Sequence, residues 1–323
     1  MKGKNILITG GGGFIGTALA ERLVDQNTVT LLDSNFENNA FRYSTISKSS
    51  NIRLANIDIL NQDDLKDVVR DAQIIIHMAA RLGVQEVIHN TKQTLDVNYI
   101  GTSNLLKAIG SNSECERFVF FSTSEVFGSN AFRITENGNS ILNSIQDPRW
   151  CYSLSKLAAE HLVFSYFRED SLPVVVIRPF NVFGPRRIGD NVARRFILNA
   201  LSCVELKVYG DGTQIRAWCY IDDFCEAVLA SMENKNAIGE AFNIGNPCNT
   251  VTIYEFAKKI ICLSDSKSRI VFEKLDFADI DIRVPNIEKA RRILGFVPKV
   301  ELDAGLITTI EWFKDHMSEL KSL

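Results

Sequence analysis

The chain has 323 residues, of which 46% are hydrophobic, and a formal net charge of −3. This is enough apolar sequence for one large core or two smaller ones, and the nearly balanced charge argues against binding to nucleic acid or to an acidic membrane surface. The seven cysteines are odd in number and form no C-x-x-C pair, so we expect reduced thiols and neither disulfides nor a metal site. No apolar run reaches the roughly 20 residues of a membrane-spanning helix. These features predict a cytoplasmic protein.

The first half of the chain alternates short β-branched runs with helical patterns. Several of the runs are apolar at consecutive positions, which is typical of parallel strands that are covered on both faces. The alternation indicates βαβ units in a doubly wound parallel sheet of the α/β class. The predicted strands are 5–9, 28–33, 51–58, 72–78, 117–122 and 173–179, and the predicted helices between them are 14–24, 94–109 and 152–167.

The second half has a looser pattern. There is no proline before Pro148 and all seven follow from there, which favours irregular connections. We interpret the chain as two interleaved units. Residues 1–178 plus about 217–245 would form a nucleotide-binding Rossmann unit, and about 179–216 plus 246–323 a smaller cap over the carboxyl ends of the strands, where open α/β sheets bind ligands. Helices are predicted in this half near 191–201, 222–232, 252–262, 286–294 and 302–319.

The segment ITGGGGFIG (8–16) lies between a predicted strand and a predicted helix. At the spacing G-x-x-G-x-x-G, Gly10 would make the tight turn, Gly13 would admit a pyrophosphate, and Gly16 would allow the helix to pack on the sheet. The N–H groups at the start of the helix attract phosphate. Gly11 and Gly12 are expected to be permissive fillers. The segment predicts a dinucleotide site.

Asp33 ends the second predicted strand, near the roughly twenty residues after the glycine turn at which a carboxylate meets the adenosine ribose. A carboxylate there accepts hydrogen bonds from the ribose diol and repels a 2′-phosphate. Asp33 therefore favours NAD over NADP, and a helix cap is the alternative role for it.

Tyr152 and Lys156, in YSLSK, lie four residues apart on one face of a predicted helix. A nearby cation favours the phenolate of a tyrosine, so Lys156 would help Tyr152 to act as a base. The same spacing also arises by chance as an ordinary exposed pair. The hydroxyls of FFSTSEVFG (120–128) at a strand end favour the catalytic interpretation, because Thr123 would share a sugar proton with Tyr152.

Taken together, these segments resemble extended short-chain dehydrogenases/reductases of the NAD-dependent nucleotide-sugar epimerase/dehydratase family. The resemblance covers nearly the whole chain and is carried by TGGGGFIG, DSN, NIDI, HMAA, VNYIGT, STSEVFG, YSLSK, RPFNVFGPR, YGDGTQIRAWCYIDD and FNIGNP. It implies NAD as cofactor, a nucleotide-diphosphate sugar as substrate with a UDP-sugar favoured, and a homodimer through the helices near 94–109 and 152–167.

The resemblance also implies roles for individual residues. Thr123, Tyr152 and Lys156 would be the catalytic set. Ser124, Asn181, Arg216 and Arg283 would contact the substrate. His77 is expected to be structural, and Phe127 stands where the family more usually has tyrosine. The implied cofactor site comprises Gly10, Gly13, Phe14, Ile15, Gly16, Asp33, Ser34, Asn35, Asp58, Ile59, Ala79, Ala80, Asn98, Tyr152 and Lys156.

The family shares oxidation of the sugar at C4, and its members differ in the step that comes after this oxidation. Elimination needs a further acid or base, and Glu125 is predicted to supply it, with a loop or capping carboxylate as the alternative. The T-S-E pattern is similar to UDP-glucuronate decarboxylases and GDP-mannose dehydratases, and Arg149-Trp150 favours the decarboxylases. Decarboxylation therefore ranks first, C4 epimerisation a close second and 4,6-dehydration third. A reductase or a catalytically idle NAD-binding module lies outside this group.

Overall fold

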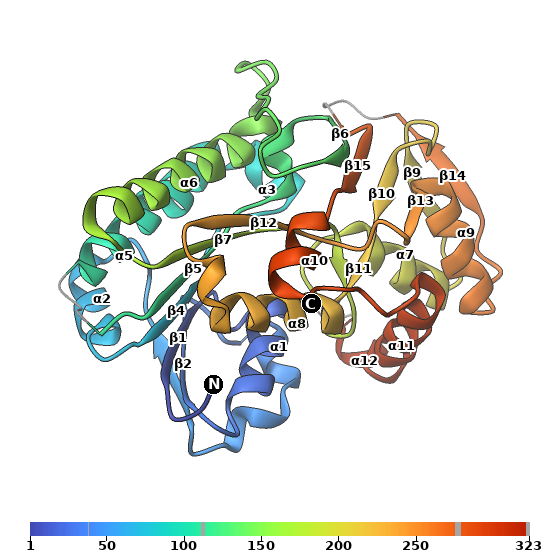
Figure 1. Ribbon diagram of the computed structural model, residues 1–323. Coiled ribbons are helices and arrows are strands. Elements are labelled where there is room, and N and C mark those ends of the chain that lie inside the picture. Colours follow the sequence, from blue (N-terminus) through green and yellow to red (C-terminus); the bar gives the residue numbers. More distant parts are fainter. Residues whose placement is uncertain (38, 111–113, 275–278, 321–323) are drawn as a thin grey trace.

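A computed structural model describes residues 1–37, 39–110, 114–274 and 279–320. Its central sheet has the strand order β12-β7-β5-β4-β1-β2-β3, and every neighbouring pair in it is parallel (Figure 1). The strand order reverses between β1 and β4, and such a switch point is where open α/β sheets bind ligands. The strands are β1 (Asn5–Thr9), β2 (Thr28–Asp33), β3 (Ile52–Asn56), β4 (Ile74–His77), β5 (Arg117–Phe121), β7 (Val174–Pro179) and β12 (Glu240–Ile244).

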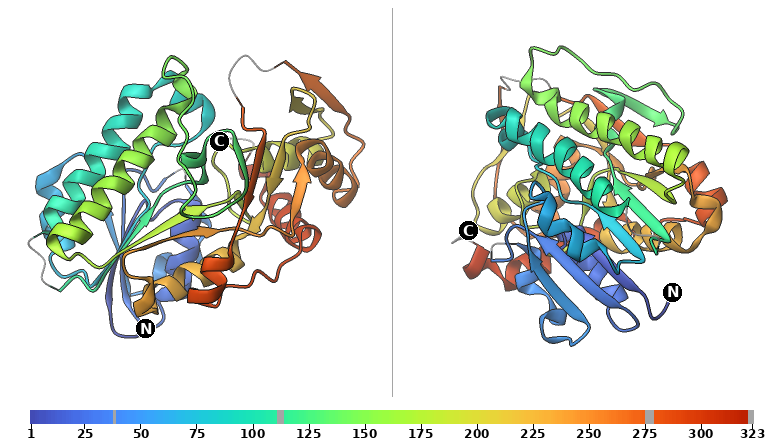
Figure 2. Two further views of the ribbon diagram at one scale, coloured as in Figure 1. Left: turned by 45° about the horizontal axis from the view of Figure 1, so that its top comes forward. Right: turned by 90° about the vertical axis from the view of Figure 1, so that its left-hand side faces the viewer.

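Helices cover both faces of this sheet (Figures 1 and 2). Ile6 and Ile8 of β1 belong to the core cluster that includes α1 (Phe14–Leu23) and α8 (Ile221–Glu233). Leu7, between them, belongs to the opposite cluster, which contains side chains of α2 (Gln62–Val69), α5 (Gly101–Ile109) and α6 (Cys151–Asp170). Side chains alternate along a strand, so a strand buried on both faces is apolar at every position. The predicted doubly wound parallel sheet is confirmed.

The helix predicted at 94–109 contains a π turn. It begins as α4 (Thr91–Leu95), widens over Asp96–Ile100 and continues as α5. Asn98 lies in the π turn, where its side chain accepts from the Arg81 N–H at 2.8 Å and donates to the Arg81 carbonyl at 3.1 Å and the Ser155 hydroxyl at 3.0 Å. Asn98 therefore connects the loop after β4 to α6. Single π turns inside α-helices are frequent at functional sites.

The helices α5 and α6 run side by side over one face of the sheet (Figure 2). Their outer surface, with that of α4 and the π turn, carries exposed apolar side chains. The homodimer expected through these helices stays a prediction. The exposed side chains are Leu95, Tyr99, Ile100 and Leu154.

Three smaller sheets lie outside the central sheet, with the orders β13-β10-β15-β6, β11-β8 and β14-β9. β6 comes from the range expected for the Rossmann unit, whereas its partner β15 comes from the range expected for the cap, so the boundaries between units stay a prediction. The strands are β6 (Asn130–Ile134), β8 (Val182–Phe183), β9 (Leu206–Tyr209), β10 (Ile215–Ala217), β11 (Cys219–Tyr220), β13 (Thr250–Thr252), β14 (Ile270–Glu273) and β15 (Ile282–Pro285). The remaining helices are α3 (Val84–His89), α7 (Val192–Leu201), α9 (Ile253–Leu263), α10 (Glu288–Leu294), α11 (Leu302–Asp315) and α12 (Met317–Leu320).

Two predictions of absence concern the described residues only. Within these ranges, no helix has the length and apolar character that crossing a membrane requires. The same ranges contain no group of three or more His, Cys, Asp or Glu side chains that could hold a metal ion. All seven cysteines are free thiols.

Candidate active site

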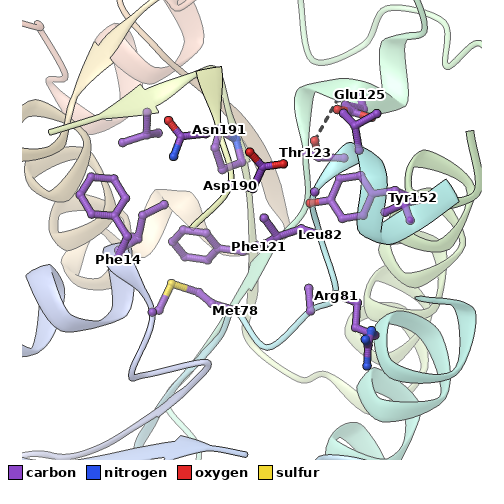
Figure 3. Close-up of a pocket in the computed structure, with 18 of the residues that line it drawn as sticks. Phe14, Met78, Arg81, Leu82, Phe121, Thr123, Glu125, Tyr152, Asp190 and Asn191 are labelled. Carbon is purple, nitrogen blue, oxygen red and sulfur yellow. Dashed lines mark hydrogen bonds between the residues drawn. The ribbon is translucent and has the colours of Figure 1, made fainter. Parts of the chain in front are cut away.

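A cavity of about 680 Å³ opens at the carboxyl ends of the central strands, with further walls from residues between Asn181 and Arg283 (Figure 3). The structure brings almost all of the predicted site residues together here. Asn35 and Asn98 do not line the cavity. The predicted residues that line it are Gly10, Gly13, Phe14, Ile15, Gly16, Asp33, Ser34, Asp58, Ile59, Ala79, Ala80, Thr123, Ser124, Glu125, Tyr152, Lys156, Asn181, Arg216 and Arg283.

The glycine turn fits a close approach by a ligand. Gly10 has a φ of +68°, and a Cβ on it would lie 2.8 Å from the Ala79 nitrogen. A Cβ on Gly16 would lie 2.7 Å from the Gly10 carbonyl oxygen, so neither position admits a side chain. A Cβ on Gly13 would meet only the Gly10 oxygen, at 3.2 Å, and Gly13 caps α1 without a side-chain hydrogen bond. The free N–H groups of this helix start suit a pyrophosphate.

The prediction that Gly11 is a filler was wrong. A Cβ on Gly11 would lie 2.8 Å from the Ile8 carbonyl oxygen and 2.9 Å from the Leu31 side chain. Packing between β1 and β2 therefore requires glycine at this position. A Cβ on Gly12 would overlap the side chain of Asn39, which can move, so Gly12 is constrained less strictly.

Asp33 is held in place by backbone N–H groups. Its Oδ2 accepts from the Gly12 N–H at 3.0 Å and its Oδ1 from the Asn35 N–H at 3.2 Å. Burial raises the pKa of the Asp33 carboxyl, and these hydrogen bonds lower it in part. Asp33 caps no helix, since Asn39 caps the 3-10 turn Ala40–Tyr43 that comes next in the chain. The carboxylate instead borders the cavity at the end of β2, as a ribose contact requires.

Tyr152 points into the cavity beside Thr123 (Figure 3). Burial and the charge of Glu125 raise the pKa of the Tyr152 hydroxyl well above its ordinary value, and the neighbouring Thr123 hydroxyl and the charges of Arg149 and Arg187 lower it only in part. Thr123 and Tyr152 thus border the cavity side by side, as the predicted relay requires.

Lys156 is fully buried, and its Nζ donates to the Phe121 carbonyl at 2.8 Å, at the end of β5. Burial lowers the pKa of Lys156 to about 7. Its ammonium also lies 5.0 Å from the centre of the Phe120 ring. Lys156 lines the cavity as predicted, but its hydrogen bond goes to the last residue of β5, two positions before Thr123.

Glu125 is enclosed by arginines. Arg149 donates from Nη1 to Oε2 at 2.6 Å and from Nη2 to Oε1 at 3.0 Å, and Arg283 Nη1 lies 3.5 Å from Oε1. Although burial raises the pKa of the Glu125 carboxyl, the two guanidinium groups outweigh it and hold the pKa at about 2. The Nε and Nη2 atoms of Arg283 and the Nε of Arg149 are buried without a partner among the described residues. The cluster presents a charged carboxylate together with unused N–H donors.

Asn181 and Arg216 are also fixed in place. Asn181 has a φ of +39° and donates from Nδ2 to the Ala217 carbonyl at 3.0 Å. Arg216 Nη1 donates to the Ile215 carbonyl at 3.0 Å, and Nη2 lies 3.4 Å from Asp279. Both side chains border the cavity, so a ligand with a diphosphate would meet a guanidinium there.

His77 is structural, as expected. Its two ring nitrogens lie 2.7 Å from the Thr9 hydroxyl and 2.9 Å from the Thr102 hydroxyl, and the ring is fully buried outside the cavity. Burial and Lys156 together hold the pKa of His77 well below its usual value.

Further polar side chains line the cavity that the sequence reasoning did not assign. Arg187 directly follows the quoted RPFNVFGPR segment, and the sequence could not show which arginine of this stretch faces inward. Gln214 lies within the quoted YGDGTQIRAWCYIDD segment, of which only Arg216 was assigned a contact. The unassigned residues include Arg81, Gln85, Arg149, Arg187, Asp190, Asn191, Arg195, Lys207, Tyr209, Gln214 and Asp279.

Known proteins resemble this chain along almost its full length. Residues 6–245 match the model of the NAD dependent epimerase/dehydratase family. The chain is 35% identical over 322 residues to UDP-N-acetyl-alpha-D-glucosaminuronate decarboxylase of Bacillus cytotoxicus, with 97% of this chain and 98% of the relative covered. It is 36% identical to UDP-glucuronic acid decarboxylase 1 of Danio rerio, with 96% and 72% covered. Among solved structures, UDP-glucuronic acid 4-epimerase of Bacillus cereus in complex with UDP-glucuronic acid and NAD superposes with a TM-score of 0.89 at 30% identity, with 96% and 99% covered.

Proposed function

We propose that this protein decarboxylates a UDP-uronate. The chain belongs to the NAD-dependent epimerase/dehydratase family and is an NAD-dependent enzyme that modifies a nucleotide-linked sugar. Decarboxylases of UDP-linked uronates are among its relatives at 35% and 36% identity. The proposed reaction oxidises the sugar at C4, releases C6 as CO₂ and restores the C4 hydroxyl.

The residues around the glycine turn fit NAD. The start of α1 would hold the pyrophosphate, and Asp33 would accept hydrogen bonds from the adenosine ribose. When bound, NAD supplies a hydride acceptor for C4 and later a hydride donor. The chain's own task is to position the sugar and to move the proton of the C4 hydroxyl.

We assign that proton transfer to Tyr152. Its side chain points into the cavity beside Thr123, so the two groups can share the proton of a sugar hydroxyl. Lys156 fixes the end of β5 through Phe121, and Thr123 comes two residues later. Lys156 therefore positions Thr123 against Tyr152, in addition to placing a buried amine beside the cavity.

The observation that carries the decarboxylase assignment is Arg283. It is buried beside Glu125, lines the cavity, and keeps Nε and Nη2 without a partner among the described residues. The carboxylate of a uronate offers acceptors for these N–H donors. Once C4 is a ketone, the carboxylate lies β to it, so the C5–C6 bond breaks with its electron pair moving towards the C4 oxygen. A proton then adds at C5, and no acid is needed to expel CO₂.

The ion pairs of Glu125 also allow the alternative reactions to be ranked by the acid or base that each reaction needs. A dehydratase must protonate a leaving hydroxyl, and a carboxyl with a pKa of about 2 cannot supply that proton near neutral pH. A C4 epimerase of a uronate needs no third acid–base group, and a solved UDP-glucuronic acid 4-epimerase superposes closely on the chain. The 4-epimerase is therefore the second candidate and the 4,6-dehydratase the third.

Mass spectrometry separates these reactions. The purified protein is incubated separately with UDP-glucuronic acid, with UDP-N-acetylglucosaminuronic acid and with dTDP-glucose, the uncharged-hexose substrate named for a dehydratase relative. Loss of one CO₂ from either uronate supports the proposal. An unchanged mass with a changed sugar configuration on NMR would establish the epimerase, and loss of one water from an uncharged hexose would establish the dehydratase.

A further inference from the structure

Thr9 and His77 are the last residues of the neighbouring strands β1 and β4, and Thr9 directly precedes the glycine turn. The Thr9 Oγ1 accepts from the backbone N–H groups of Met78 and Ala79, both at 3.2 Å, and the Thr9 carbonyl also accepts from the Met78 N–H at 3.0 Å. Met78 and Ala79 line the cavity, and the Ala79 nitrogen lies so close to Gly10 that no Cβ fits between them. The Thr9 hydroxyl therefore holds part of the cavity wall against the glycine turn.

His77 joins Thr9 to the π turn through both of its ring nitrogens. Nδ1 lies 2.7 Å from the Thr9 hydroxyl, and Nε2 lies 2.9 Å from the Thr102 hydroxyl. Thr102 donates its one hydroxyl hydrogen to the Asn98 carbonyl at 2.6 Å, so it accepts a hydrogen bond from Nε2–H of His77. In the neutral ring Nδ1 is then the acceptor, and the Thr9 hydroxyl donates to it. A second ring proton would place a third N–H donor against the Thr9 oxygen, which already accepts two.

The π turn continues this hydrogen-bond network to α6. Asn98 Nδ2 donates to the Ser155 hydroxyl at 3.0 Å, and that hydroxyl donates to the Tyr152 carbonyl at 2.7 Å. The side chains of the network are fully buried, so bulk water does not compete for their hydrogen bonds. The network connects the wall beside the glycine turn with the backbone of Tyr152. Its side chains are Thr9, His77, Thr102, Asn98 and Ser155.

We propose that His77 is a positioning residue for the cofactor, which acts by holding its proton on Nε2 and so fixing the orientation of the Thr9 hydroxyl. In this tautomer the Thr9 hydrogen points at Nδ1, and its lone pairs face the N–H groups of Met78 and Ala79. His77 thus shapes a wall of the NAD site while lying outside the cavity lining itself. The role concerns cofactor binding, so it is the same for a decarboxylase and for an epimerase.

The tautomer of His77 is measured by ¹⁵N NMR on the full-length protein, labelled with ¹⁵N-histidine and saturated with NAD. Nδ1 should give the resonance of an unprotonated, hydrogen-bonded imidazole nitrogen, and Nε2 that of a protonated one. Replacing the three other histidines with glutamine, one at a time, assigns the signals without altering the network. They are His89, His161 and His316. A ring that carries its proton on Nδ1, or on both nitrogens, at pH 7 would overturn the proposal.

Thr9→Val removes the hydroxyl while keeping the shape of the side chain. It should weaken NAD binding by about twofold to tenfold, the range for loss of one neutral hydrogen bond, and Thr9→Ser should restore the affinity. Calorimetry measures NAD affinity, and thermal unfolding shows that each variant is folded. Thr309→Val is the matched control, because the buried Thr309 hydroxyl donates to the Gly305 carbonyl within its own helix, α11. It should leave NAD affinity unchanged.

Thr102→Val tests whether the effect passes through His77, whose two nitrogens join Thr9 and Thr102. It should weaken NAD binding by about twofold to tenfold in the otherwise wild-type protein. In the Thr9→Val protein it should change the affinity little, because the hydroxyl that transmits the effect is gone. Equal losses in the two backgrounds, or an unchanged affinity in Thr9→Val, would contradict the proposal. The tautomer measurement needs no variant of the network, so it decides the question if Thr102→Val does not fold.

Discussion

Arg149 binds both carboxylate oxygens of Glu125, with its Nη1 2.6 Å from Oε2 and its Nη2 3.0 Å from Oε1. The pair is buried, with side-chain exposures of 4% for Arg149 and 15% for Glu125. A carboxylate in this arrangement stays charged at neutral pH. It is therefore better suited to orient Arg149 and Arg283 than to transfer protons. The predicted acid–base role of Glu125 remains a prediction, and the geometry limits it to that of a weak base.

Removing the charge of Glu125 should destabilise the protein. Glu125→Gln leaves Arg149 and Arg283 buried without a counter-charge, and breaking such a buried pair costs about 3–5 kcal/mol. Denaturant unfolding measures this loss. The double variant Glu125→Gln/Arg149→Gln should recover part of the stability, because one of the uncompensated cations is also gone. A Glu125→Gln variant as stable as the wild type would show that the ion pairs contribute nothing.

Tyr152→Phe should lower turnover by about 10²–10⁴-fold, the contribution of positioned acid–base catalysis. NAD affinity and thermal stability should hardly change, because only the hydroxyl is lost. Tyr166→Phe is the control, since Tyr166 lies on the same helix but outside the cavity. Near-normal turnover by the Tyr152 variant would remove the tyrosine from the mechanism.

Asp33→Asn should weaken NAD binding by about tenfold to a hundredfold, since hydrogen bonds to charged groups contribute about 1.5–3 kcal/mol. It should also improve binding of NADP relative to NAD, because the negative charge that repels a 2′-phosphate is gone. Calorimetry with both cofactors measures the two changes, and Asp25→Asn, at an exposed position, is the control. Tighter binding of NADP than NAD by the wild type would contradict the assignment of Asp33.

Two glycines of the turn should differ in what they support. Gly11→Ala places a Cβ 2.8 Å from the Ile8 carbonyl oxygen, so it should lower the melting temperature. Gly13→Ala meets only the Gly10 oxygen, at 3.2 Å, so it should leave the fold nearly unchanged while weakening NAD binding. Melting temperature and NAD affinity are measured for both variants. The opposite pattern would mean that Gly11 faces the ligand and Gly13 the core.

Lys156 should make stability depend on pH above neutrality. Its pKa is about 7 in the folded protein against an ordinary 10.5, so between these values the unfolded chain binds the proton and the folded protein does not. Stability contributed by this residue therefore rises with pH across that window. Lys156→Met should flatten the rise, seen as the difference between the two unfolding curves from about pH 7 to pH 10. If the pH dependence of stability were the same in both proteins, Lys156 would be protonated in the folded protein, and this prediction would be wrong.

The sequence alone predicted the parallel sheet, the glycine turn and the family. These features depend on local patterns, because consecutive apolar residues indicate a strand covered on both faces, and a turn motif lies within a few residues. The spacing of Tyr152 and Lys156 likewise places both on one face of α6. The residues at the ends of successive parallel strands then had to meet at one edge of the sheet.

Only the tertiary structure decided which charges are paired. Glu125 and Arg283 are 158 positions apart, and Arg186 reaches Glu21 across 165. Neither pairing can be read from spacing, since the partner of a guanidinium depends on distances of a few ångströms between elements that are remote in the chain. Position 11 likewise could not be judged from the sequence. It requires glycine because a Cβ there would collide with the Leu31 side chain on the neighbouring strand. Local periodicity determined the scaffold of this protein, and the three-dimensional packing determined the charge state of the groups in its cavity.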